Sequence, residues 1–170
     1  MNLSEWNDRY RSREEIAGDP AQLLVEAAHA LPSGRALDLA CGAGRNALWL
    51  ASRGWEVVAI DGAEEAIRIL REHDPVIDGG IDARVMDLEA EAPLPFDDAS
   101  FDLVAILYYL HRPLFAEAKR LVKPGGIVVC AVKMRGTYRG NPGELAQHFE
   151  DFEVLRSSEG EIAELVARRR

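Results

Sequence analysis

The stretch ALDLACGAGRNALWLA, residues 36–51, decides the fold of this chain. It starts as a short apolar strand, passes through a glycine-rich turn and ends with the apolar spacing of an amphipathic helix. One acid, Asp38, lies inside the strand, and a second acid, Asp61, ends the next apolar run, WEVVAID. A strand, a glycine turn, a helix and a second strand predict one unit of parallel sheet, with ligands bound near the carboxyl ends of its strands.

The rest of the chain alternates between strand-like and helical patterns. Strands are predicted at residues 35–40, 55–60, 83–86, 101–108, 127–132, 152–155 and 162–167. The predicted helices start at Asp19, with Pro20 at the first helical position, and at Ala63, Pro113 and Asn141. This alternation predicts an α/β protein with a mostly parallel sheet and helices on both faces.

Length and composition limit the class of protein. A chain of 170 residues with a hydrophobic fraction of 48% predicts one globular domain, residues 1–170. No apolar run reaches the roughly 20 residues of a membrane span, so no membrane association is expected. The net charge of −9 disfavours binding of nucleic acid. Cys41 and Cys130 have no Cys or His at metal-ligand spacing, so we expect no metal site and a cytoplasmic location.

The glycine turn is compatible with two kinds of cofactor. Residues 42–47, GAGRNA, fit the pattern G-x-G-x-x-G/A that binds the pyrophosphate of NAD(P) or FAD. A pyrophosphate needs bare N–H groups at the start of the helix, whereas Asp38 brings negative charge to this turn. A carboxylate attracts the ammonium and sulfonium of S-adenosylmethionine, which has no phosphate. We therefore predict S-adenosylmethionine as the cofactor, and an NAD(P)-dependent oxidoreductase is the alternative.

The chain resembles, over nearly its whole length, the S-adenosylmethionine-dependent methyltransferases of the Rossmann-like, or class I, superfamily. Residues 36–51 resemble the first motif of that family, VVAIDGA the second, LPFDDASFDLVAILYYL the segment around the fourth strand and LVKPGGIVVCAV the fifth strand. CGAGRN, together with W-x-x-R-Y from Trp6 to Tyr10, is similar to the small-molecule branch, which includes the tellurite-resistance and thiopurine enzymes. The resemblance implies a three-layer Rossmann-like fold, in which a mostly parallel seven-stranded sheet has an antiparallel C-terminal strand. It also implies methyl transfer from S-adenosylmethionine to a small nucleophilic acceptor, with release of S-adenosylhomocysteine.

Carboxylates make most of the cofactor contacts that this resemblance implies. Asp38 faces the methionine ammonium, and the alternative is that its carboxylate only braces the glycine turn. Asp61 binds both ribose hydroxyls, and the alternative is that it caps the following helix. Asp87 accepts a hydrogen bond from the adenine amino group. If the strand register shifts, Asp82 or Glu89 takes its place.

Small residues and one arginine complete the predicted cofactor site. Gly42 and Gly44 let the backbone approach the cofactor closely. The amide of Leu88 donates to a ring nitrogen of adenine. Arg45 pairs with the methionine carboxylate, and the alternative is a solvated arginine. The remaining predicted contacts are Ala40, Gly62 and Leu107.

A second group of residues is predicted to face the acceptor. Tyr108, His111 and Arg112 follow the fourth strand, where the family places substrate-facing groups. His111 is the candidate general base for a hydroxyl or thiol, or else a polar residue at a helix start. Arg112 is a candidate partner for an acidic group of the acceptor. Tyr10 belongs either to a lid formed by residues 1–18 or to a contact that pins this segment to the core.

The segment after the fourth strand also departs from part of the family. Amine-methylating branches carry an acidic residue or Asn, then Pro-Pro and an aromatic residue, at this place. This chain has LYYL at residues 107–110, which disfavours methylation of DNA adenine and similar amines. Little sequence remains to cover a large substrate, which predicts either a small acceptor or a lid from a second copy or partner chain. A regulatory subunit that binds the cofactor without turnover is the non-enzymatic alternative.

Overall fold

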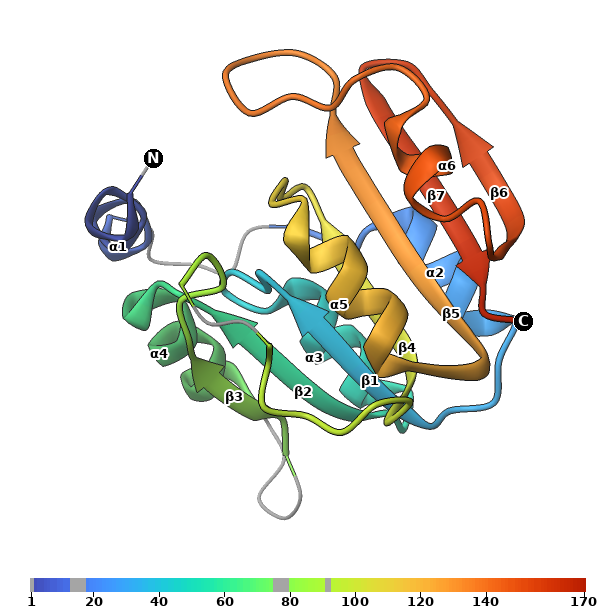
Figure 1. Ribbon diagram of the computed structural model, residues 1–170. Coiled ribbons are helices and arrows are strands. Elements are labelled where there is room, and N and C mark those ends of the chain that lie inside the picture. The colour runs from blue at the N-terminus through green and yellow to red at the C-terminus, as the bar shows by residue number, and fades with distance from the viewer. Residues whose placement is uncertain (1, 13–17, 75–79, 91–92) are drawn as a thin grey trace.

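The computed structural model describes residues 2–12, 18–74, 80–90 and 93–170. Within them, one sheet of seven strands has the order β3-β2-β1-β4-β5-β7-β6 (Figure 1). The strands are β1 (Arg35–Leu39), β2 (Glu56–Asp61), β3 (Asp82–Val85), β4 (Phe101–Leu107), β5 (Val122–Lys133), β6 (Glu153–Ser158) and β7 (Ile162–Arg168). Strands β1 to β5 pair in parallel, and β7 runs antiparallel to β5 and β6. The predicted mostly parallel sheet with an antiparallel C-terminal strand is confirmed.

Helices cover both faces of this sheet, as Figure 1 shows. The helices are α1 (Leu3–Arg11), α2 (Gln22–His29), α3 (Arg45–Ser52), α4 (Glu64–His73), α5 (Pro113–Leu121) and α6 (Glu144–His148). Side chains of α5 and α6 pack into the core on one face, and those of α2, α3 and α4 into the core on the other. Because the central strands are buried on both faces, they read as continuous apolar runs in the sequence. No helix in the described ranges combines the length and apolar character needed to cross a bilayer.

The backbone marks the edge of the sheet at which a ligand is expected. The strand order reverses between β1 and β4, and in sheets of this kind ligands bind beyond the carboxyl ends of the two strands at such a reversal. The residue after each strand is left-handed, with φ of 58° at Ala40 and 62° at Tyr108. This conformation is strained for residues other than glycine, and such strain gathers at functional sites. Both strained residues therefore lie at the edge that the sequence pattern also singles out.

Helix α2 starts later than the sequence predicts. Asp19 and Pro20 have the residue types of an N-cap and a first helical position, but the cap is Ala21, without a side-chain hydrogen bond. The Ala21 N–H donates to Oδ1 of Asn46 at 2.9 Å, and the Asp19 carbonyl accepts from Nη1 of Arg45 at 3.0 Å. These contacts with α3 hold the segment outside the helix, so tertiary structure overrides the local signal.

The turn signal Lys123–Gly126 lies inside β5 rather than before it. Phe101 of β4 pairs with Val122, and Leu103 pairs with Ile127, so the KPGG segment bulges out opposite one residue of β4. Backbone hydrogen bonds between this segment and Arg169 hold the bulge. The predicted strand, residues 127–132, therefore covers only the regular part of β5.

The helix α1 was not predicted from the sequence. It begins with a capping box, in which the Asn2 side chain accepts from the Glu5 N–H and the Glu5 carboxylate accepts from the Asn2 N–H. The residues of this pattern, Asn followed three positions later by Glu, are visible in the sequence and are the signal that could have revealed the helix. Of the predicted lid, residues 1–18, only residues 2–12 and 18 lie in the described part.

Candidate cofactor and acceptor site

The turn between β1 and α3 needs glycine at two positions. Gly42 has φ of 57°, and Gly44, the N-cap of α3, has φ of 90°. A Cβ on Gly44 would lie 2.2 Å from Cδ1 of Leu70 in α4, and a Cβ on Gly42 would lie 2.6 Å from the Tyr10 hydroxyl. The turn is thus packed against Leu70 of α4 at Gly44 and against Tyr10 of α1 at Gly42. Neither position has room for a side chain.

Asp38 is a buried carboxyl group whose surroundings leave it incompletely satisfied. The residue is 1% exposed, and its Oδ2 atom has no hydrogen-bond partner in the described structure. Burial, and then the charge of Asp61, raise the pKa of Asp38 to about 7, although the charge of Arg45 opposes this shift. A buried polar atom without a partner is costly, so it points to a ligand that supplies one.

Asp61 has the opposite environment, although it lies on the neighbouring strand. Its Oδ2 accepts from the Gly42 N–H at 2.8 Å, and its Oδ1 accepts from the Ala63 N–H at 2.9 Å. Burial raises the pKa of Asp61, and these two backbone hydrogen bonds partly offset the rise. Asp61, rather than Asp38, therefore braces the glycine turn. Each of its oxygens keeps a second lone pair that can accept a hydroxyl group.

Arg45 makes two contacts with the protein. Beyond its bond to the Asp19 carbonyl, its guanidinium lies 5.6 Å from the centroid of the Tyr108 ring. The next residue, Asn46, is buried and holds the Ala21 N–H. Our sequence reasoning missed Asn46, and the available signal is a polar residue on the otherwise apolar buried face of α3. Arg45 thus connects the segment before α2 with the ring that follows β4.

The predicted adenine contacts lie beyond the end of β3. The Met86 N–H donates to the Asp61 carbonyl at 3.0 Å, which places the next residues beside the end of β2. Asp87 accepts through Oδ1 from the Glu89 N–H at 3.0 Å, and the Leu88 side chain is buried in the core. Asp87 therefore faces the same edge as Asp61, with one of its oxygens already in a local turn.

Helix α1 lies over this edge of the sheet, next to α4 (Figure 1). A Cβ on Gly62 would lie 2.5 Å from Cδ2 of Leu3, so Leu3 fills the space beside this glycine. The Asn7 side chain accepts from the Glu65 N–H at 3.0 Å and so caps α4 from another helix. Together with the contact of Tyr10 on Gly42, these contacts place α1 across both glycine-containing turns.

On the acceptor side, two adjacent tyrosines differ in their environment. Tyr108 is 39% exposed, and its N–H donates to the Ala131 carbonyl at 2.7 Å, which holds the strained backbone. Tyr109 is half-buried and donates to Oε1 of Glu89 at 2.9 Å. Burial, and then this bond, raise the pKa of Tyr109. Tyr108 is therefore the exposed aromatic ring at the end of β4, and Tyr109 links this loop to the segment after β3.

His111 and Arg112 are adjacent in the segment between β4 and α5, but they have different contacts. His111 is half-buried, and its carbonyl accepts from the Leu114 N–H in the first turn of α5. The Arg112 guanidinium binds both carboxylate oxygens of Glu144, with 3.1 Å between Nη2 and Oε2. Arg112 is thus paired with Glu144 of α6, so an acidic acceptor would compete with Glu144 for this guanidinium.

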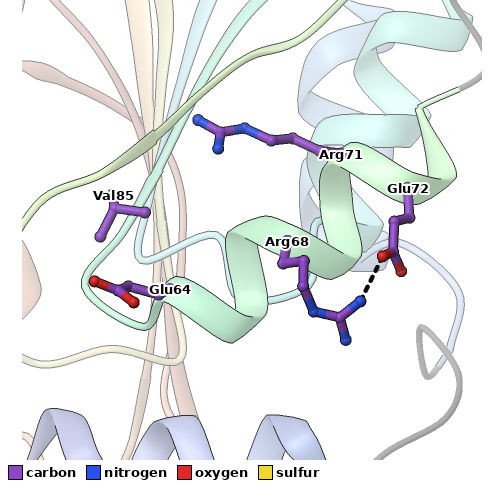
Figure 2. A pocket seen from close by; sticks show the side chains of 5 residues that line it. All are labelled: Glu64, Arg68, Arg71, Glu72 and Val85. Atoms are coloured by element: carbon purple, nitrogen blue, oxygen red, sulfur yellow. Dashed lines mark hydrogen bonds and ion pairs between the residues drawn. The ribbon is translucent and has the colours of Figure 1, made fainter.

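A groove lies between α4 and β3. It has a volume of about 410 Å³ and is lined by Glu64, Arg68, Arg71, Glu72 and Val85 of α4 and β3 (Figure 2). Arg68 binds Glu72 at 2.5 Å, and Nη2 of Arg71 donates to the Ala83 carbonyl at 2.6 Å. Arg68, Arg71 and Glu72 are therefore already engaged in contacts with the protein. In the described ranges, no cluster of three or more His, Cys, Asp or Glu could hold a metal ion.

Comparison with known proteins matches the elements that build this site. A family model described as a methyltransferase domain matches residues 37–130, more than half of the chain. A demethylmenaquinone methyltransferase of Renibacterium salmoninarum is 36% identical over 115 residues, which cover 65% of this chain and 46% of that protein. A ubiquinone biosynthesis O-methyltransferase of Xanthomonas campestris is 36% identical over 114 residues, which cover 64% of this chain and 47% of that protein. The chain spans about half the length of these curated relatives.

Solved structures agree on the architecture. TehB from Haemophilus influenzae superposes with a TM-score of 0.77 at 21% identity, and the match covers 100% of this chain and 68% of that chain. At this identity the likeness shows the Rossmann-like fold alone. The family match includes the glycine turn, Asp38 inside β1, Asp61 at the end of β2, and β4. The chain belongs to the methyltransferase domain family.

Proposed function

We propose that this protein transfers the methyl group of S-adenosylmethionine to a small nucleophilic acceptor and releases S-adenosylhomocysteine. Family membership supports the reaction class. The observation that carries the cofactor is Asp38, whose buried oxygen lacks a partner beside a glycine turn braced by a second carboxylate. Two carboxylates at such a turn fit a cationic, phosphate-free adenosine compound.

The residues present fit this cofactor along its whole length. Asp38 would face the methionine ammonium, with Arg45 at the carboxylate, and Asp61 would accept from the ribose hydroxyls. At the far end, Asp87 would accept from the adenine amino group and the N–H of Leu88 would donate to the ring. The remaining proposed contacts are residues at which the backbone can approach the cofactor, or that lie at the end of a strand beside it. They are Ala40, Gly42, Gly44, Gly62 and Leu107.

The two alternatives fit these observations less well. A dinucleotide needs N–H groups for its pyrophosphate, but Asp61 already takes the Gly42 N–H and Asp38 adds a second acid. A regulatory subunit without turnover would need no acceptor side, whereas this chain places an exposed, strained Tyr108 beside the site. The family match also favours the transferase over both.

In the proposed mechanism the protein aligns the reactants and excludes water. When bound, S-adenosylmethionine supplies a methyl group that its sulfonium has already activated. Tyr108 and Tyr10 would border the acceptor, and His111 would take the proton of a hydroxyl acceptor. Cys41 is not a nucleophile in this scheme, because burial raises the pKa of its thiol well above the usual value.

One titration and one screen test the proposal. Calorimetry with S-adenosylmethionine, NAD and NADP in parallel should give binding of the first alone. Thiol, hydroxyl, amine and metalloid acceptors are then screened for release of S-adenosylhomocysteine. Tight binding of a dinucleotide with no binding of S-adenosylmethionine would overturn the proposal.

His111→Ala provides a narrower test of the acceptor side. We expect unchanged affinity for S-adenosylmethionine, and a 100- to 1,000-fold slower reaction with a hydroxyl acceptor found in the screen. A thiol acceptor, already ionised in part at neutral pH, should lose much less. Full activity of the variant on a hydroxyl acceptor would remove His111 as the base.

We further propose that α1 is the predicted lid. Because this lid comes from the same chain, no lid from a partner chain is needed, and a small acceptor is favoured. Leu3→Ala with Tyr10→Ala should weaken S-adenosylmethionine binding about tenfold, because both side chains contact the glycine turns. The melting temperature should change by less than about 2 °C, since no residue of α1 is buried. Val154→Ala with Leu155→Ala, at exposed apolar positions of β6, is the matched control. Equal affinity of the two double variants would contradict the lid.

The two cysteines bear on the cellular location of the protein. Both cysteines, Cys41 and Cys130, are free and buried. Free thiols without a disulfide partner are usual in a reducing compartment, so we propose the cytoplasm.

A further inference from the structure

Two carboxyl groups, Asp38 of β1 and Asp61 of β2, lie on neighbouring strands and have different partners. Asp61 accepts two backbone N–H groups and is therefore stabilised as an anion. Asp38 is 1% exposed, and its Oδ2 has no partner in the described structure. The site thus combines one anion fixed by the backbone with one carboxyl group whose charge depends on what else is bound.

We propose that Asp38 distinguishes the sulfonium cofactor from its thioether product by exchanging a proton for the positive charge of the ligand. This inference rests on the proposed function. In the empty site Asp38 holds a proton, and a cationic ligand expels that proton to solvent. After methyl transfer, the sulfur keeps the electron pair of the broken S–CH₃ bond and is neutral. Asp38 then takes up a proton again, which weakens the hold on the product.

The groups that face Asp38 support a proton in the empty site. They come from three elements: Asp61 on β2, Arg45 on α3 and Cys41 in the turn after β1. Burial and Asp61 raise the pKa of Asp38 to about 7, and Arg45 only partly opposes them. The Cys41 thiol stays neutral, because burial and both acids raise its pKa. Arg45 donates to the Asp19 carbonyl and lies near the Tyr108 ring, and it forms no ion pair with Asp38 in the described structure.

The two ligands differ at this site by one positive charge. S-adenosylmethionine carries an ammonium, a carboxylate and a sulfonium, whereas S-adenosylhomocysteine lacks the sulfonium. Both ammonium groups favour the ionised form of Asp38, and the sulfonium adds a further attraction in a crevice shielded from water. The pKa of Asp38 is therefore expected to fall further with the cofactor bound than with the product bound.

The experiment measures both affinities by calorimetry between pH 5.5 and 7.5, in two buffers of different ionisation enthalpy. Below a pKa of about 7 the ligand must expel the proton, so affinity for S-adenosylmethionine should rise by about tenfold per pH unit and then level off. Between pH 5.5 and 7.5, the total increase in affinity for S-adenosylhomocysteine should be about threefold smaller than the increase for S-adenosylmethionine. The buffer comparison should show release of nearly one proton with the cofactor and clearly less with the product.

Asp38→Asn tests whether this residue is the source of the pH dependence. The amide cannot ionise, so affinity for S-adenosylmethionine should be weaker and the ratio of the two affinities should stay constant with pH. Glu56→Gln, a carboxyl-to-amide change at the exposed start of β2, should keep the pH dependence of the original chain. If Asp38→Asn does not fold by circular dichroism, the proton count on the unaltered protein still decides the question.

Two failures can be told apart. Absence of binding by either ligand at every pH would contradict the proposed function itself. Binding of both ligands with the same pH dependence, or without proton release, would overturn the role of Asp38 and leave the proposed function standing.

Discussion

Asp61→Ala is expected to weaken binding of S-adenosylmethionine by about a hundredfold or more while the domain stays folded. In the proposed complex this carboxylate accepts from both ribose hydroxyls, and a hydrogen bond to a charged group contributes about 1.5–3 kcal/mol. Loss of one such bond with partial loss of the second gives about 2.7 kcal/mol, which corresponds to a hundredfold change in affinity. The variant also frees the Gly42 N–H, so the glycine turn loses the bond that fixes it.

Calorimetry and thermal unfolding together check this expectation. The melting temperature should fall by only a few degrees, because both bonds are only partly buried and water can replace the lost carboxylate oxygens. Asp61→Asn keeps one acceptor oxygen and should lose less affinity than the alanine variant. Affinity equal to that of the unaltered chain would show that the ribose assignment is wrong.

Gly44→Val is expected to destabilise the fold by about 3–5 kcal/mol. With φ of 90°, a β-branched residue at this position adds strain of about 1–3 kcal/mol. The new Cβ would lie 2.2 Å from Cδ1 of Leu70, a fully buried side chain, and overpacking of this kind costs a further 1–3 kcal/mol or so. The glycine turn and the packing of α4 must therefore both shift.

Thermal unfolding measures this effect, and the chain contains a matched control. The melting temperature of Gly44→Val should fall by roughly 10 °C or more. Gly136 also has a positive φ, 97°, but a Cβ there would meet nothing within 4 Å. Gly136→Val carries the backbone strain without the collision and should cost about half as much or less. Equal melting temperatures for the two variants would contradict the packing argument at Gly44.

The local signals in the sequence were sufficient for the architecture. Apolar runs bounded by turns predicted every strand to within a few residues, except β5, whose KPGG segment bulges out inside the strand. Residue types near the helix starts gave the helices on the sheet, although α2 begins at Gln22 because Asn46 and Arg45 hold the preceding segment. These signals depend on residues that are close in the sequence, so they can be recognised before the fold is known.

The sequence also located the site, because parallel strands bring their carboxyl ends to one edge. Asp38, Asp61 and Tyr108 could be assigned to that edge from their positions at the ends of apolar runs. Their partners could not be assigned in this way. Arg112, for example, binds Glu144, which is far away in the sequence, and no local pattern indicates that pair.

By itself, therefore, the sequence determined the order of the strands and of the helices after α1, the glycine turn and the acids near the strand ends, since each depends on neighbours along the chain. Only the tertiary structure decided that Asp61 braces Gly42 while an oxygen of Asp38 stays without a partner. It also decided that α1 lies across the glycine turns. The physical reason is that hydrogen bonds and burial between distant segments arise only when the sheet and its helices pack together.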